Sequence, residues 1–210
     1  MEPEIKRLFG VPVYSTEINR DFNIEEWQEV AKHQKLNYEW CSELGHDSNF
    51  FSRDTYVLNN KKFSQLKKDL DLILKDYFDK IINPSDTTIK PYITQSWLNY
   101  LYEGGYHNVH SHPNALVSGV LYFKCSPEKD SIRFYDTVPD QFKIPPKIYT
   151  EYNSCEWWFS VAPKKLLLFP AKTRHAVKIV RDNDLRISLA FNVFIKGHLG
   201  SNTTLTELTL

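Results

Sequence analysis

The sequence has few cysteines, few glycines and no long apolar run. Its three cysteines, Cys41, Cys125 and Cys155, are far apart and form no C-x-x-C pair. This pattern indicates neither a disulfide framework nor a thiolate zinc site. No apolar run approaches the roughly 18 to 20 residues that span a bilayer, and the first residues, MEPEIKRLFG, lack the apolar stretch of a secretory signal. We therefore expect a cytoplasmic protein without membrane segments and with reduced cysteines.

The sequence also lacks an excess of charge of either sign. It contains 26 basic and 26 acidic side chains, so its formal net charge is zero. Bulk charge therefore gives no sign of binding to nucleic acid or to an anionic membrane surface. A local basic face is still compatible with this composition.

Apolar and aromatic residues, by contrast, are plentiful. Hydrophobic residues make up 41% of the chain and aromatic residues 14%. A chain of 210 residues is long enough to bury a sizeable core, and it contains no repeat, low-complexity tract or linker. We expect a single domain over residues 1–210, with helical support at about 20–85 and a β-core at about 90–196. No role is predicted for residues 197–210.

Two segments near the N-terminus have the pattern of helices. Residues 24–35 follow Asn23, a possible N-cap, and place acidic residues in the first turn and basic residues in the last. Residues 61–82 repeat apolar side chains at intervals of three and four, and Asn83-Pro84 ends the pattern.

From Lys90 onward, β-branched and aromatic residues alternate with polar ones, which is typical of strands. Gly, Pro and Asn turn signals separate the runs. The predicted strands are 91–103, 107–112, 116–125, 131–136, 146–152, 156–161, 164–169, 174–180 and 185–195. Short strands at this spacing predict a mainly β fold, a sandwich or jelly roll with the N-terminal helices on one outer face.

Three histidines lie within six residues in YHNVHSHPNALVSG, residues 106–119. In an extended strand, residues two apart point to the same side, so His110 and His112 share a face and His107 points away from it or lies in the loop. Two imidazoles can converge on one metal ion but leave it short of ligands. A third ligand is available in His175, because strands distant in sequence face each other across a jelly roll.

The motifs around these histidines resemble those of the 2-oxoglutarate/Fe(II) oxygenases. The segments are QSWLNYLYEGGYHNVHSHPNALVSGVLYFK, LLLFPAKTRHAV and RISLAFN, with RLFGVPVY near the start of the chain. They match an aromatic strand, H-x-H-P, S-G-x-x-Y, a strand ending in F-P, a distal histidine and R-x-S-x-x-F-N. The resemblance implies a double-stranded β-helix, which is a cupin-like jelly roll.

The resemblance also implies roles for individual residues. His110, His112 and His175 would be the Fe(II) ligands and the catalytic residues, and Arg186 with Ser188 would bind the distal carboxylate of 2-oxoglutarate. Tyr122 would be a further donor to that carboxylate. A planar guanidinium can hold a carboxylate through two hydrogen bonds, which lysine cannot. The alternative for Arg186 is a surface arginine paired with Asp182 or Asp184, although its apolar strand argues against this.

One feature departs from the usual oxygenase pattern. Such enzymes generally bind iron through two histidines and one carboxylate, and here His112 stands in the carboxylate's place. Either the site has three histidines, which we favour, or Asp136 or Glu103 completes it.

The sequence thus predicts an Fe(II)- and 2-oxoglutarate-dependent dioxygenase that hydroxylates a small-molecule or peptidyl substrate and releases succinate and CO2. A homodimer is left open. Candidate substrate contacts are the side chains of Trp97, Asn99, Tyr102, Trp157 and Trp158. The alternatives are a cupin-like three-histidine enzyme without 2-oxoglutarate and a metal-free jelly-roll binding protein.

Overall fold

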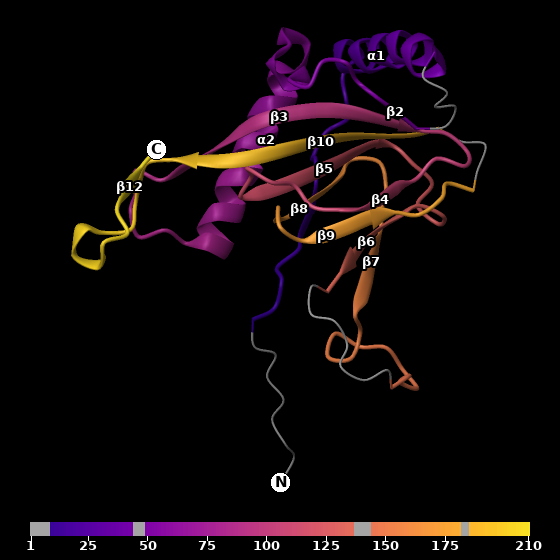
Figure 1. The fold of residues 1–210 in the computed structure, drawn as a ribbon. Helices are drawn as coiled ribbons and strands as arrows, with labels where there is room; N and C mark the ends of the chain where they lie inside the picture. The colour runs from indigo at the N-terminus through magenta and orange to yellow at the C-terminus, as the bar shows by residue number, and fades with distance from the viewer. Residues whose placement is uncertain (1–8, 44–48, 137–143, 182–184) are drawn as a thin grey trace.

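The chain folds into three layers (Figure 1). A computed structural model describes residues 9–43, 49–136, 144–181 and 185–210, with side chains from residue 9 to 34 in the first of these ranges. Two helices cover one face of a six-stranded sheet, here called the major sheet. A four-stranded sheet, the minor sheet, lies against the other face.

The major sheet has the strand order β1-β8-β5-β10-β3-β2, and every neighbouring pair is antiparallel. The long strand β10 is central and pairs with β3 on one side and β5 on the other. The strands are β1 (Tyr14–Glu17), β2 (Asn49–Phe51), β3 (Lys90–Leu101), β5 (Val117–Lys124), β8 (Lys165–Pro170) and β10 (Arg186–Lys196).

The minor sheet has the order β4-β9-β6-β7, again with antiparallel pairs. Its strands are β4 (His107–His110), β6 (Ser131–Tyr135), β7 (Glu156–Ser160) and β9 (Arg174–Val177). A further two-stranded hairpin, β11 (His198–Leu199) with β12 (Leu208–Thr209), extends from the end of β10 (Figure 1).

Alternation along the major strands divides the core in two, because successive side chains of a strand point to opposite faces. Leu121 and Phe123 of β5 pack in the cluster that contains the helix residues. Tyr122, between them, packs instead with Ile132 and Phe134 of the minor sheet. The space between the two sheets is therefore a second core. This arrangement confirms the predicted jelly roll with helices on one outer face.

The two helices follow their sequence signals. Helix α1 (Ile24–Glu43) begins with a reciprocal capping box, in which the Glu26 N–H donates to Asn23 Oδ1 and the Asn23 N–H donates to Glu26 Oε2. It continues eight residues beyond the predicted end at residue 35. Helix α2 (Ser64–Tyr77) buries an apolar stripe and is flanked by a 3-10 turn at Lys61–Phe63 and a π turn at Phe78–Ile82. Together these three elements confirm the predicted helix at 61–82.

One predicted strand is wrong, and four short strands were not predicted. Residues 146–152 form bends and turns, with Ile148 and Tyr149 largely exposed and Asn153 donating to the Ile148 carbonyl. Their alternating pattern finds no partner strand, because β7 pairs only with β6 among the described strands. Strands β1, β2, β11 and β12 are too short to give a period of two in the sequence. No helix in the described ranges is long and apolar enough to cross a membrane.

Gly119 of β5 packs directly against the ring of Phe191 on β10. It is paired with Phe191, and a Cβ added at Gly119 would lie 2.2 Å from the tip of that fully buried ring. We expect Gly119→Ala to lower the free energy of unfolding by about 1–3 kcal/mol, the usual range for overpacking a core. Urea denaturation measures the loss. The double variant Gly119→Ala/Phe191→Leu should recover part of it, whereas additive losses would contradict the packing explanation.

Candidate metal centre

The pairing of β4 with β9 sets the positions of two of the three predicted ligands. His110, the last residue of β4, is the direct cross-strand partner of His175 on β9. His107 pairs with Val177. Between the two pairs, β4 advances by three residues and β9 by two, so β4 contains a bulge. Paired residues point to the same face, and His175 and Val177 share a face. His107 therefore lies on the same side as His110, and the predicted opposite orientation is wrong.

His112 lies in the loop that follows β4, because the strand ends two residues before its predicted end at residue 112. The loop is anchored where the His112 N–H donates to the Ala171 carbonyl, 2.9 Å away, in the connection between β8 and β9. Its ring packs 5.7 Å from Trp97 of β3. The backbone contact brings His112 back toward β9, where the other two histidines lie.

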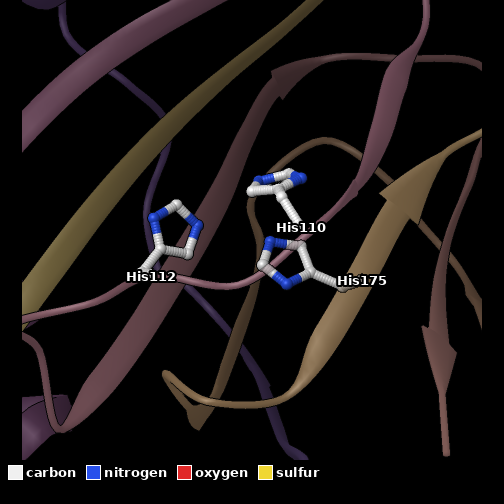
Figure 2. Close-up of side chains that lie close together, drawn as sticks. All are labelled: His110, His112 and His175. Carbon is white, nitrogen blue, oxygen red and sulfur yellow. The ribbon is translucent and has the colours of Figure 1, made fainter. Parts of the chain in front are cut away.

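The three imidazoles converge (Figure 2). One nitrogen from each of His110, His112 and His175 lies within 4.8 Å of the others. The ring centroids are 4.3 Å apart for His110 and His175, and 5.1 Å apart for each of the pairs that include His112. Two nitrogens bound to one ion at about 2.1 Å are at most about 4.2 Å apart. Small rotations of the rings therefore suffice for all three to bind one ion.

Backbone hydrogen bonds orient two of these rings. The Nδ1 atom of His110 lies 2.7 Å from the Asn108 carbonyl, and the Nδ1 atom of His175 lies 2.9 Å from the Thr173 carbonyl. A carbonyl can only accept, so in each ring Nδ1 carries the proton. Nε2 then has a free lone pair, which is the form in which histidine binds a metal.

Burial lowers the pKa of two of the three clustered histidines, His112 and His175. It lowers the pKa of His175 to about 3, against a smaller opposing effect of its hydrogen bond to the Thr173 carbonyl. Burial and then the neighbouring His110 lower the pKa of His112 to about 4. The pKa of His107 is also about 4, because of burial and then the charge of Arg186. His112 and His175 are therefore neutral near pH 7, which is the form of histidine that binds a divalent cation.

The carboxylate alternatives are not part of this cluster. Within the described ranges, the group of potential ligands contains the three histidines and no Asp or Glu. Asp136 is exposed just after β6, and Glu103 is exposed in the turn after β3. The geometry therefore fits a site of three histidines better than one completed by either carboxylate.

Arg186 begins β10 and is almost fully buried, at 2% exposure. Its Nη2 donates to the Tyr122 hydroxyl at 3.2 Å and its Nη1 to the Ser131 carbonyl at 3.3 Å. Asp130, a partner that the sequence gave no signal for, has a carboxylate oxygen 3.9 Å from Nη1. The buried Nε has no hydrogen-bond partner in the part of the chain that the structure describes. A buried donor left unpaired costs about 1–3 kcal/mol, so the guanidinium has capacity for an anion.

Ser188 and Tyr122 lie beside Arg186 on the face of the major sheet that looks toward the minor sheet. Ser188 is two residues from Arg186 on β10, is buried, and pairs with Tyr122 across β5. The Tyr122 hydroxyl accepts from Arg186 and keeps its own proton, because burial raises its pKa. Asp182 and Asp184, the alternative partners of Arg186, lie outside the described residues.

The residues predicted to contact the substrate fall into two groups by their position. Trp97 and Asn99, on the inner face of β3, lie near His112 and Ser188 respectively. Trp157 and Trp158 are instead exposed on β7, stacked 5.9 Å apart, and Tyr102 contacts the α1 side through its hydroxyl and Gln34. Trp97 and Asn99 therefore lie near the candidate site. Tyr102, Trp157 and Trp158 lie outside it.

The buried histidines make the stability of the metal-free protein depend on pH. Unfolded histidine has a pKa of about 6.5, so below that pH the unfolded chain binds protons that folded His175 does not bind until about pH 3. Stability is therefore lost as the pH falls below about 6.5. His175→Gln should remove up to about 1.4 kcal/mol per pH unit from this slope, a limit that is approached near pH 5. Urea denaturation in EDTA between pH 7 and 5 measures it, and an unchanged slope would contradict the burial of a neutral imidazole.

Comparison with known proteins identifies a family model and similar folds. The model described as "Putative 2OG-Fe(II) oxygenase" matches residues 95–192, a little under half of the chain. No curated protein matches the chain. The crystal structure of HygX from Streptomyces hygroscopicus with nickel and 2-oxoglutarate bound has a TM-score of 0.52 and 12% identity, over 87% of this chain and 82% of HygX.

Two further structures are similar at slightly lower scores. A Pseudomonas putida prolyl-4-hydroxylase has a TM-score of 0.49 and 12% identity, over 86% of this chain and 91% of its own. An oxidoreductase of the 2OG-Fe(II) oxygenase family from Burkholderia pseudomallei has a TM-score of 0.48 and 14% identity, over 69% of this chain; the chain spans 65% of its length. The chain therefore has the jelly-roll fold seen in HygX, and its residues 95–192 match the family model of 2OG-Fe(II) oxygenases, which confirms the resemblance noted in its motifs.

Proposed function

We propose that the protein is an oxygenase that uses Fe(II) and 2-oxoglutarate to hydroxylate a substrate, with release of succinate and CO2. One observation carries the proposal: three convergent histidines share the inter-sheet space with a buried arginine whose Nε has no hydrogen-bond partner among the described residues. The matched family model and the fold shared with HygX support it.

The iron would be held by one ring nitrogen from each of His110, His112 and His175. In His110 and His175 this nitrogen would be Nε2, because Nδ1 donates to a backbone carbonyl. Three protein ligands leave positions for a cosubstrate and O2, as oxygenase chemistry requires. When bound, Fe(II) with 2-oxoglutarate and O2 supplies the oxidising power for breaking a substrate C–H bond. The chain's own contribution is to fix the ring orientations through the Asn108 and Thr173 carbonyls and to exclude water.

Arg186 would bind the distal carboxylate of 2-oxoglutarate. Its unpartnered Nε and one Nη atom can donate together to two carboxylate oxygens, and the Tyr122 O–H can donate a further hydrogen bond. Ser188, on the same face, would contact the same group. Asp130 and the Ser131 carbonyl would position the guanidinium from the other side.

The rival functions account for less of this arrangement. A cupin-like enzyme without 2-oxoglutarate would leave the donors of Arg186 buried without a ligand. A metal-free binding protein would leave three imidazole lone pairs facing one another. A small-molecule or peptidyl substrate fits the proposal equally well, and Trp97 and Asn99 are its nearest candidate contacts. Cytoplasmic location and a homodimer remain predictions.

The three histidines can be tested by metal binding. We expect His110→Ala, His112→Ala and His175→Ala each to weaken binding of Fe(II), or of Ni(II), Co(II) or Zn(II), by more than about 100-fold, because even supporting residues around a metal are worth 10- to 100-fold. Titration under anaerobic conditions measures the affinity. His107→Ala is the matched control, since His107 is also partly buried on the same side but is not one of the three clustered residues. Loss of the metal in that control and retention in His112→Ala would refute the assignment.

Arg186 separates the oxygenase from its cupin-like rival. The Arg186→Ala variant should still bind iron, but its affinity for 2-oxoglutarate should fall by about 30- to 1000-fold. This loss is equivalent to about 2–4 kcal/mol, as for a charge-assisted contact. Arg186→Lys should restore part of this affinity, because the charge returns without the planar fork. Anaerobic titration of the Fe(II) protein with 2-oxoglutarate, followed by the visible charge-transfer band, measures the effect. Absence of the band in the wild type would favour the cupin-like function.

A further inference from the structure

A cleft of about 740 Å³ opens beside the proposed cosubstrate site, at the end of the minor sheet where β6 begins and β9 ends. Its lining contains four basic side chains, two apolar or aromatic side chains that are exposed, and no acidic residue among those described. The lining residues are Tyr106, Lys129, Ser131, Arg133, Val177, Lys178, Ile179 and Arg181. For a chain with no net charge, this is a strong local excess of positive charge.

Two of the four cations are not neutralised by any described acidic residue. Arg133 is paired with Glu156 at 2.6 Å. Lys178 and Arg181 are exposed and form no ion pair within the described ranges. Asp130, which lies between the lining residues Lys129 and Ser131 in the sequence, is 3.9 Å from Arg186 and accepts a hydrogen bond from the Ser126 N–H. Lys178 and Arg181 therefore present charge to the cleft that no described carboxylate neutralises.

The cleft is connected to the metal centre through two strands. Val177 lies two residues from His175 along β9, which is roughly 7 Å at the backbone. Tyr106 directly precedes His107, the partner of Val177 across β4. On the other side, the carbonyl of Ser131 accepts the hydrogen bond from Arg186. The cleft therefore lies next to the strands that carry His110 and His175.

We infer that the cleft binds an anionic group, a carboxylate or a phosphate, of the substrate that the enzyme oxidises. Lys178 and Arg181 would bind this group, and the exposed faces of Tyr106 and Ile179, 48% and 57% exposed, would contact its apolar part. The inference rests on the proposed function and narrows the substrate to acidic molecules. It assigns the cleft a role separate from Arg186, which faces the inter-sheet space and binds the cosubstrate.

The test uses the full chain loaded with Zn(II) and saturated with 2-oxoglutarate, so that Arg186 is already occupied. Inorganic phosphate and a hexaglutamate peptide are titrated separately, by calorimetry and by the amide NMR shifts of residues 177–181. We expect one or both probes to bind and to shift these amides, and the affinity to fall as salt is raised. Binding of phosphate would indicate a small acidic substrate, and preference for hexaglutamate would indicate an acidic polypeptide segment.

In the variant Lys178→Glu/Arg181→Glu, the affinity for the probe should fall by more than tenfold. The metal and 2-oxoglutarate should still bind. Lys61→Glu/Lys68→Glu is the matched control: it makes the same change in net charge on exposed positions of the helical layer, and it should bind the probe like the wild type. Equal weakening in both double variants, binding of neither probe, or displacement of the probe by excess 2-oxoglutarate would overturn the inference. Loss of 2-oxoglutarate binding in the wild type would instead refute the proposed function.

Discussion

The bulged pairing of β4 with β9 is the contact on which the rest of the site depends. It places His110 directly opposite His175 and turns His107 to the same side. The loop after β4 then needs only one backbone hydrogen bond, from His112 to Ala171, to complete the cluster. Because both strands belong to a sheet that packs on Phe169 and Tyr122, His110 and His175 are held against a buried core, and the loop residue His112 is tied to it through Ala171.

Burial and function are coupled through the same residues. The apolar space between the sheets lowers the pKa of His175 and His112, so both are neutral and ready to bind a cation near pH 7. The same space buries the charge of Arg186, which faces Asp130 at 3.9 Å and has an Nε donor with no partner among the described residues. Tyr122, which burial keeps protonated, adds a donor at the same point. In the proposed function, the histidines form a cation site and Arg186 an anion site, each completed by its ligand.

Much of the fold and of the candidate site could be predicted from the sequence. The spacing of residues indicated the strands and the His110/His112 pair, and the family resemblance implied the roles of Arg186 and Ser188. The H-x-H pair, the distal His175 and the R-x-S pattern are local signals, and the long alternating strands gave the jelly roll. The orientation of His107 could not be predicted, since a bulge adds one residue without changing the composition of the strand. The ion pair with Asp130 and the basic cleft likewise depend on how distant strands are paired. Residues 146–152 were predicted as a strand because alternation alone does not show whether a partner strand is available.

The central claim is that the three histidines bind a metal ion whose remaining positions take 2-oxoglutarate, with Arg186 on its distal carboxylate. A crystal structure of the protein with Ni(II), which resists oxidation, and 2-oxoglutarate tests this most directly. The result we predict is nickel bound by His110, His112 and His175, and a carboxylate of 2-oxoglutarate hydrogen-bonded to Arg186 and Tyr122. Nickel held by a carboxylate in place of His112, or 2-oxoglutarate bound away from Arg186, would contradict it.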